Sequence, residues 1–182
     1  MAPTWKDYVK EICVPVENKF LEKRFRNRDL LIRALLRRDK LEKPLDPDYP
    51  ELHEIRFQDG LDTIGDKILD FLIFDYFIDE FVKDSEPNKL KQKINKKRED
   101  YGGNKILQNF SQNRIHLYNY ILWSDNEWDN TIWEKAGSKA LATCFEALIA
   151  AVYLDKGIAG VTDMLDRIKF FDEIQALNTQ IR

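Results

Sequence analysis

The chain contains no proline after Pro87, and this absence strongly constrains its fold. Proline removes a backbone donor and breaks the interior of a helix, so the whole second half of the sequence is open to long helices. Glycine and proline together account for 13 of the 182 residues, well below the roughly 12% of average usage. A fold of many short strands needs more turn-forming residues than this. The sequence therefore predicts an all-α protein.

The composition narrows the class of protein further. The chain is 43% hydrophobic and has 11 Phe, 7 Tyr and 4 Trp, which is enough to bury a core and excludes wholesale disorder. Two cysteines exclude a disulfide scaffold and fit a reducing compartment. His53 and His116 are isolated from other zinc-ligand residues, so no zinc site is expected. No apolar run approaches the roughly 20 residues of a membrane span, and we expect a soluble, cytoplasmic protein with no membrane partner.

The formal net charge of -3 hides a segregation of charge along the chain. Residues 1–40 carry +5 and residues 41–88 carry -10, whereas residues 89–114 carry +6 and residues 115–182 carry -4. Two basic segments therefore flank an acidic one. This pattern is compatible with a nucleic-acid partner, and also with solvated helix faces that happen to cluster.

Apolar residues at helical spacing predict a series of helices. Asp29 is expected to cap a helix near the N-terminus. A helix that follows Gly60 is expected to be long, largely buried and complete before Pro87. Gly157 stands where a C-terminal cap is expected. Further helices are expected over about 89–100, 104–110, 137–155 and 160–177.

Four aspartates near the start of the helix after Gly60 are spaced three, four and four residues apart: Asp59, Asp62, Asp66 and Asp70. This spacing puts them on one helical face, where like charges repel one another. A hard divalent cation such as Mg²⁺ prefers oxygen ligands and would offset the repulsion. A solvated acidic stripe is the alternative interpretation.

Glu146 is surrounded by apolar residues for two helical turns. A glutamate in such a helix either lies at its solvent edge or is held by a partner. A metal ion shared with Asp62 and Asp66 would be such a partner.

Two segments resemble the signature motifs of the ribonuclease III family. Leu61-Asp62-Thr63-Ile64-Gly65-Asp66-Lys67-Ile68-Leu69 is similar to the family's first signature helix, usually Leu-Glu-Phe-Leu-Gly-Asp-Ala-hydrophobic-Leu. The segment from Lys139 to Gly157, which contains Phe145-Glu146-Ala147-Leu148 and Tyr153-Leu154-Asp155, is similar to its second acidic helix. Residues 25–38 resemble the opening helix pair, and residues 90–95 resemble the segment before the middle helices. The resemblance covers about residues 19–172.

The resemblance implies an all-α homodimeric nuclease domain. In that family four carboxylates per subunit gather Mg²⁺, or Mn²⁺, beside the scissile phosphodiester of double-stranded RNA. By position, Asp62, Asp66 and Glu146 would be catalytic metal ligands, and Asp59 would lie beside them at the start of the signature.

Two positions of the implied metal site depart from the family pattern. Thr143 stands where the fourth metal ligand is normally Asp, and Asp62 is one methylene shorter than the usual Glu. A neutral threonine is a weak ligand, so the loss of one carboxylate bears directly on catalysis. Asp59 or Asp70 would be the residues to compensate.

The length of the chain carries a second implication. Family members usually add a double-stranded-RNA-binding domain, but only 11 residues follow Phe171. We therefore expect one ribonuclease III-like domain over residues 1–182, similar to the compact bacterial and archaeal branches of the family. The motif Gly65-Asp66 without a preceding Glu-Phe is closer to archaeal members. RNA would then be bound by the domain itself or by a partner, with these basic candidates: Lys89, Lys93, Lys96, Lys97, Arg98, Arg37 and Arg38.

The helix after Gly60 carries more apolar side chains than one core needs, including Phe71, Phe74 and Phe77. We interpret part of this surface as a two-fold dimer interface, as the resemblance also implies.

Two main hypotheses follow. The first is a Mg²⁺-dependent endoribonuclease that cleaves double-stranded or structured RNA to 5′-phosphate and 3′-hydroxyl ends. The second is a catalytically inactive dimer of the same fold that binds structured RNA or a ribonucleoprotein. A helical dimer that binds only proteins is the remaining alternative.

Overall fold

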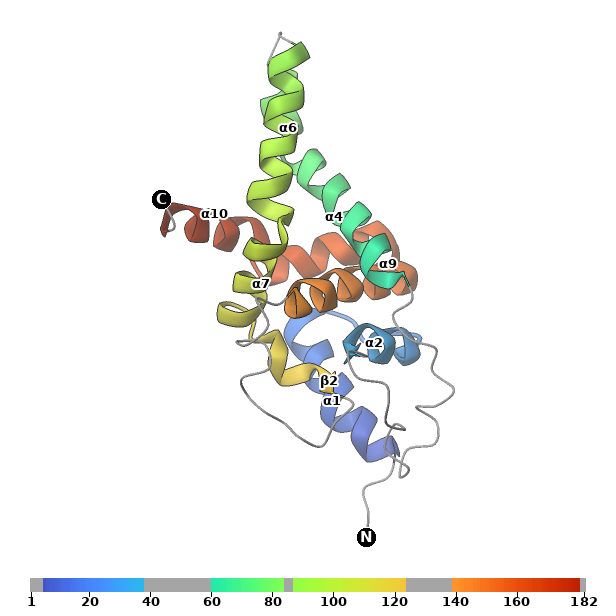
Figure 1. Cartoon of the computed structure of the whole chain (residues 1–182). Coiled ribbons are helices and arrows are strands. Elements are labelled where there is room, and N and C mark those ends of the chain that lie inside the picture. The colour runs from blue at the N-terminus through green and yellow to red at the C-terminus, as the bar shows by residue number, and fades with distance from the viewer. Residues whose placement is uncertain (1–4, 38–59, 84–86, 124–138, 181–182) are drawn as a thin grey trace.

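A computed structural model describes residues 5–37, 60–83, 87–123 and 139–180 (Figure 1). Within these ranges the chain is helical, as predicted, apart from two strands of two residues each that pair in parallel, with Leu36 opposite Leu122. The elements in chain order are α1 (Trp5–Phe20), α2 (Arg28–Leu35), β1 (Leu36–Arg37), α4 (Leu61–Tyr76), α5 (Ile78–Val82), α6 (Pro87–Gly102), α7 (Asn104–Asn113), the 3₁₀ helix η1 (Leu117–Tyr120), β2 (Leu122–Trp123), α9 (Ala140–Arg167) and α10 (Phe170–Gln180).

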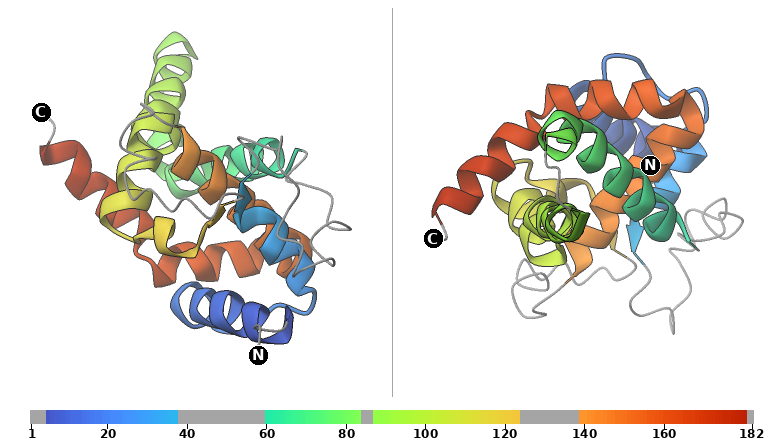
Figure 2. Two further views of the ribbon diagram at one scale, coloured as in Figure 1. Left: turned by 60° about the horizontal axis from the view of Figure 1, so that its bottom comes forward. Right: turned by 90° about the horizontal axis from the view of Figure 1, so that it is seen from above.

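Helix α9 lies at the centre of the fold. From Ala140 to Val152 every side chain except that of Thr143 is buried or nearly so. Helices α4, α2 and α7 all pack against it (Figures 1 and 2). A helix that is apolar on all sides is stable only when other elements surround it, and α9 fulfils that condition. Among the helices of the described ranges, none has both the length and the apolar character of a membrane span.

Two residues with positive φ bend the C-terminal part of the chain. Gly157 has φ 72° and ψ -171° and interrupts α9 at the predicted position, but a second helical segment follows it directly. Lys169 has φ 51° and separates α9 from α10, so the single helix expected over 160–177 is wrong. The turn at Lys169 carries Phe170 into the core, where its ring stacks on Phe145 at 5.7 Å between centroids.

The helix expected to run from Gly60 to Pro87 is also broken. Helix α4 ends at Tyr76, Phe77 leaves the helical conformation, and the short helix α5 follows. The Phe77 ring packs edge-to-face on Tyr101 of α6 at 4.9 Å. The aromatic contact with α6 therefore ends α4 earlier than its apolar spacing predicts. The expectation that this helix is largely buried is wrong as well, because Phe71 is 55% exposed.

Helix α1, which contains Pro15, was not predicted from the sequence. Pro15 is on the exposed side, whereas Cys13, Val16 and Phe20 form a fully buried face. This face follows helical spacing and packs into the main core.

Helix α2 is capped by Asn27 and not by Asp29. The helix begins at Arg28, and the side-chain oxygen of Asn27 accepts a hydrogen bond from the Asp29 backbone N–H at 3.1 Å. This is the hydrogen bond that an N-cap residue makes. Asp29 is the second residue of the helix and lies in its first turn.

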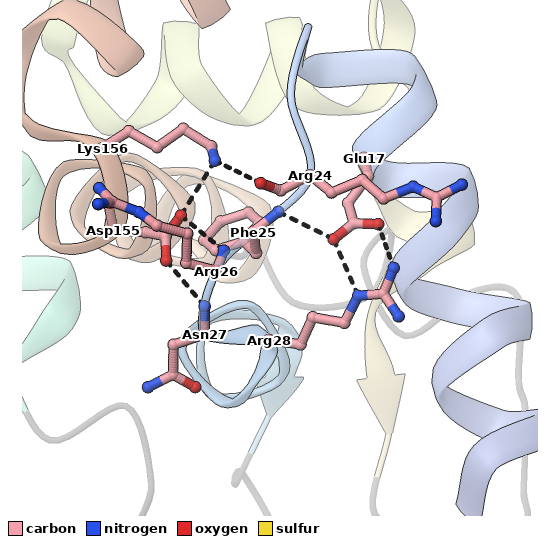
Figure 3. Close-up of polar contacts among 8 residues, drawn as sticks. All are labelled: Glu17, Arg24, Phe25, Arg26, Asn27, Arg28, Asp155 and Lys156. Atoms are coloured by element: carbon pink, nitrogen blue, oxygen red, sulfur yellow. Dashed lines mark hydrogen bonds and ion pairs between the residues drawn. The ribbon is translucent and has the colours of Figure 1, made fainter.

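Asp155 anchors the connection between α1 and α2 to α9 (Figure 3). Its buried carboxylate accepts hydrogen bonds from the backbone N–H groups of Asn27 at 2.9 Å and Arg26 at 3.1 Å. The Lys156 ammonium donates to the same carboxylate at 3.0 Å and to the Arg24 carbonyl at 2.6 Å. Burial alone would raise the pKa of Asp155, but the two amide donors and Lys156 outweigh it and lower the pKa.

Glu17 of α1 holds the same connection from the other side. Its buried carboxylate accepts a hydrogen bond from the Phe25 backbone N–H at 3.1 Å. The Arg28 guanidinium donates to both of its oxygens, at 3.0 and 2.8 Å. Two buried carboxylates from distant helices thus fix residues 24–28 (Figure 3).

We predict that Asp155→Ala lowers the free energy of unfolding by about 2–4 kcal/mol, because it leaves two buried amides and Lys156 without their acceptor. Urea unfolding followed by circular dichroism measures the change. Asp163→Ala, which removes an exposed carboxylate from the same helix, is the matched control. Equal losses in the two variants would contradict the role of Asp155.

Candidate functional site

Helices α4 and α9 approach each other most closely at Gly65. A Cβ atom on Gly65 would lie 1.8 Å from the carbonyl oxygen of Glu146 and 2.5 Å from its carbonyl carbon. No side chain fits in this space, so glycine alone permits the contact between the two backbones. The Gly65-Asp66 pair of the first motif thus meets the Glu146 of the second.

This contact brings the acidic residues of the two motifs together. Asp62, Asp66 and Asp70 are half-buried and follow one another at four-residue steps on α4, which places them on one face. Glu146 of α9 is only 8% exposed. The two acidic elements predicted from the sequence therefore meet where α4 crosses α9.

The pKa of Glu146 reports this environment. Burial raises it first, and the negative charges of Asp66, Asp62 and Asp70 raise it further, to about 7 from 4.5. Lys139 at the start of α9 acts in the opposite direction. Negative charge is thus concentrated and incompletely balanced around Glu146, which is the electrostatic condition that favours a bound cation.

Two basic side chains partly neutralise the aspartates. The Lys67 ammonium is 2.7 Å from a carboxylate oxygen of Asp66 and 3.5 Å from one of Asp70. The Arg98 guanidinium reaches from α6 and donates to both oxygens of Asp70, at 2.7 and 2.5 Å. Asp70 is therefore already held by a basic side chain from another helix.

The donor set fits a hard divalent cation in its chemistry. All of its charged groups are carboxylates, the ligands that Mg²⁺ prefers, and the negative charges of Asp66, Asp62 and Asp70 act on Glu146 in addition to its burial. As the side chains stand, no three histidine, cysteine, aspartate or glutamate residues among those described are gathered to hold one ion. Asp66 instead pairs with Lys67, and Asp70 pairs with Arg98.

Thr143 and Asp59 are the two remaining residues of the predicted site. Thr143 is half-buried on α9, three residues before Glu146, and so lies on the same side of the helix. Asp59 precedes Gly60, whose φ is 84°, and lies outside the described residues.

Several predicted RNA-binding residues form ion pairs within the protein. Lys89, Lys93, Lys96 and Arg98 are exposed on α6. Arg98 binds Asp70 as described, and Lys96 pairs with Asp100 at 3.1 Å. Arg37 lies in β1, and Arg38 is outside the described residues.

Lys97 has a structural environment that the sequence did not reveal. It is half-buried, pairs with Glu80 at 2.9 Å, and places its ammonium 3.8 Å from the centre of the Phe77 ring. It therefore helps to join α5 to α6 and is less accessible to a ligand than the other lysines of α6.

An apolar groove lies beside the acidic face, between α4 and the break in α9. It has a volume of about 540 Å³. Phe71, Tyr153 and Ile158, which are 55%, 40% and 40% exposed, form its apolar wall. Of the other two phenylalanines expected at a dimer interface, Phe74 stacks on Phe81 at 5.5 Å and Phe77 packs on Tyr101. The remaining lining residues are Thr63, Ile64, Lys67 and Ile68.

The raised pKa of Glu146 predicts a pH-dependent stability of the metal-free protein. A carboxyl group whose pKa is higher in the folded protein binds extra protons there, so its contribution to stability falls as pH rises from about 4.5 to about 7. We expect Glu146→Gln to remove this decrease and to stabilise the protein at pH 8 by about 1–3 kcal/mol.

Urea unfolding in EDTA, repeated from pH 4.5 to pH 8, measures the difference between wild type and variant over the range in which Glu146 titrates. Glu22→Gln, at an exposed position, is the control. Parallel curves for wild type and Glu146→Gln would show that Glu146 titrates normally.

Solved structures share this fold. The nuclease domain of ribonuclease III from Campylobacter jejuni, at 24% identity, superposes with a TM-score of 0.60 over 85% of this chain and 91% of that one. A second structure of that nuclease domain gives a TM-score of 0.63 over 86% of this chain and 96% of that one, and it is described as showing flexibility in the region involved in dimer formation.

Curated relatives and a family model agree with the structural likeness. Ribonuclease 3 of Wolinella succinogenes is 29% identical over 156 residues, which are 86% of this chain and 56% of the relative. Ribonuclease 3 of Borreliella burgdorferi is 31% identical over 117 residues, 60% of this chain and 44% of the relative. The chain thus spans about half the length of these relatives. The family model of the Ribonuclease III domain matches residues 59–157, a range that includes all of α4 and extends to the break in α9 at Gly157. The chain belongs to the ribonuclease III family.

Proposed function

We propose that this protein is a Mg²⁺-dependent endoribonuclease that cleaves double-stranded or structured RNA and leaves 5′-phosphate and 3′-hydroxyl ends. The observation that carries the proposal is the position of Glu146, buried in α9 and facing the aspartates of α4 where the two helices touch. The membership of the ribonuclease III family supports the reaction type. Residues 19–172 would form the single domain that performs it.

Asp62, Asp66 and Glu146 would hold the cation, with Thr143 and Asp59 at the edge of the site. A bound Mg²⁺ or Mn²⁺ would activate water and stabilise charge on the leaving oxygen. Glu146 must be ionised to serve as a ligand, and its pKa of about 7 leaves it partly protonated in the metal-free protein near neutral pH. Binding of the cation would therefore displace the proton from Glu146. The affinity of the site for the cation would fall as the pH drops below 7.

Thr143 makes the proposed site less negative than the family pattern. Its hydroxyl is neutral, and Asp70 is already held by Arg98. The three carboxylates of Asp62, Asp66 and Glu146 would then carry the cation, with water and phosphate oxygens of the RNA completing its shell, as is usual for Mg²⁺.

The exposed face of α6 would bind the RNA backbone. Figure 1 shows α6 projecting from the body of the protein, with its N-terminal end farthest out. Lys89, Lys93 and Lys96 are exposed along it, and Arg98 connects it to the acidic face. Binding through phosphates depends on salt and on the shape of the RNA helix more than on base sequence. Arg37, in β1, and Arg38, outside the described residues, stay candidates from the sequence alone.

The apolar groove would be covered by a second copy of the chain. Phe71 is 55% exposed beside Tyr153 and Ile158, and an apolar surface of this kind needs a partner in solution. A two-fold arrangement would pair the groove with the same surface of the partner. The Campylobacter jejuni nuclease domain is described as having a region involved in dimer formation, which supports a second copy as the partner.

Cleavage of a long, uniformly labelled double-stranded RNA tests the proposed activity. With Mg²⁺ or Mn²⁺ at low salt we expect cleavage by the wild type and a loss of more than about 100-fold in Glu146→Gln and Asp66→Asn. Asp163→Asn, at an exposed position, should cleave normally. End-group analysis of the products should show 5′-phosphates. RNA that is bound in a gel shift but never cleaved would favour the inactive, RNA-binding alternative.

The dimer makes a separate prediction. Phe71→Glu places a charge in the apolar groove and should convert the protein to a monomer in analytical ultracentrifugation. Val82→Glu is the control, because Val82 is 75% exposed but lies outside the groove. A monomeric wild type, or equal masses for wild type and Phe71→Glu, would refute the proposed interface.

A further inference from the structure

A lysine ammonium lies within the proposed metal site. Lys67 Nζ is 2.7 Å from Asp66 Oδ2 and 3.5 Å from Asp70 Oδ2. A lysine ammonium is charged at physiological pH, and carboxylate oxygens of both aspartates face it. Asp66 therefore has a cationic partner before any metal ion arrives.

The two basic side chains at the site are held differently. Arg98 makes two hydrogen bonds to Asp70 and comes from another helix, so it fixes the carboxylate in place. Lys67 binds Asp66 through a single contact, and its side chain is 66% exposed. An exposed single-contact ion pair is weak, so Lys67 can be displaced whereas Arg98 cannot be displaced easily.

We propose that Lys67 is an internal competitor of the divalent cation: its ammonium occupies Asp66 and must leave before the metal ion binds. This inference rests on the proposed function, because it takes Asp66 as a metal ligand. Lys67 then sets the cation concentration at which the site fills. A released ammonium can keep its attraction to Asp70, which lies 3.5 Å from it already.

Substitutions at Lys67 can remove the ammonium while keeping the rest of the side chain's packing. The side chain also lines the apolar groove together with Phe71 and Tyr153. Lys67→Met keeps the length and apolar character of the stem but removes the ammonium, so it leaves the wall of the groove intact. Lys67→Gln is a second neutral variant in case the methionine disturbs folding, and Lys67→Arg retains the charge.

The test is a titration of the full chain with Mn²⁺, with free Mn²⁺ measured by electron paramagnetic resonance and no RNA present. Removing an exposed ion-pair partner should tighten Mn²⁺ binding by about two- to fivefold in Lys67→Met, and Lys67→Arg should bind like the wild type. Lys105→Met, at an exposed position on α7, controls for the loss of one positive charge. Light scattering confirms that the variants share one oligomeric state.

Thermal unfolding gives an independent readout. Without metal, Lys67→Met should unfold at a lower temperature than the wild type, because Asp66 and Asp70 then repel each other with less compensation. Saturating Mn²⁺ should stabilise this variant by a larger increment than it stabilises the wild type.

The results distinguish competition by Lys67 from the existence of the metal site. If the wild type binds Mn²⁺, Glu146→Gln does not, and both neutral Lys67 variants bind with wild-type affinity, then the competition is refuted while the metal site stands. If neither the wild type nor the Lys67 variants bind Mn²⁺, the proposed metal site itself fails, and the competition fails with it.

Discussion

The absence of a side chain at Gly65 is the constraint on which the acidic site depends. Any Cβ atom there would overlap the Glu146 carbonyl, so a larger residue would push α4 away from α9. The close contact of the two backbones lets carboxylates from both helices meet in one place. It also leaves Glu146 buried beside the aspartates, which raises its pKa to about 7. The packing of two helices and the chemistry of the site thus have a common origin.

Concentrated negative charge needs compensation, and the fold supplies part of it from α6. Arg98 joins the basic helix to Asp70, while Lys97 joins it to Glu80 and to the Phe77 ring. The basic segment therefore stabilises the acidic segment within one molecule. The net charge of -3 results from basic and acidic segments that largely cancel along the chain, and it does not argue against RNA as a partner.

The sequence predicted those features that depend on local spacing. The sequence placed Asp62, Asp66 and Asp70 on one face of a helix, because they are spaced four residues apart. It also placed Glu146 on an apolar helix, and in the structure these aspartates lie near it. Contacts between distant residues were not predictable in this way. Phe77 ends α4 because it meets Tyr101 of another helix, Arg98 reaches an aspartate 28 residues away, and Asp155 holds backbone amides 128 and 129 residues away. Lys67 could have been noticed, because it lies three residues before Asp70 on the same helix.

In the proposed function, the contact between α4 and α9 creates a site for one divalent cation. Anomalous X-ray diffraction from crystals soaked in Mn²⁺ tests it most directly, because the signal locates the metal without reference to activity. We expect a peak between Asp66 and Glu146, within coordination distance of their carboxylate oxygens and of Asp62, with Lys67 turned away from Asp66. A Mn²⁺ peak elsewhere, or a well-ordered acidic face without one at saturating Mn²⁺, would contradict it.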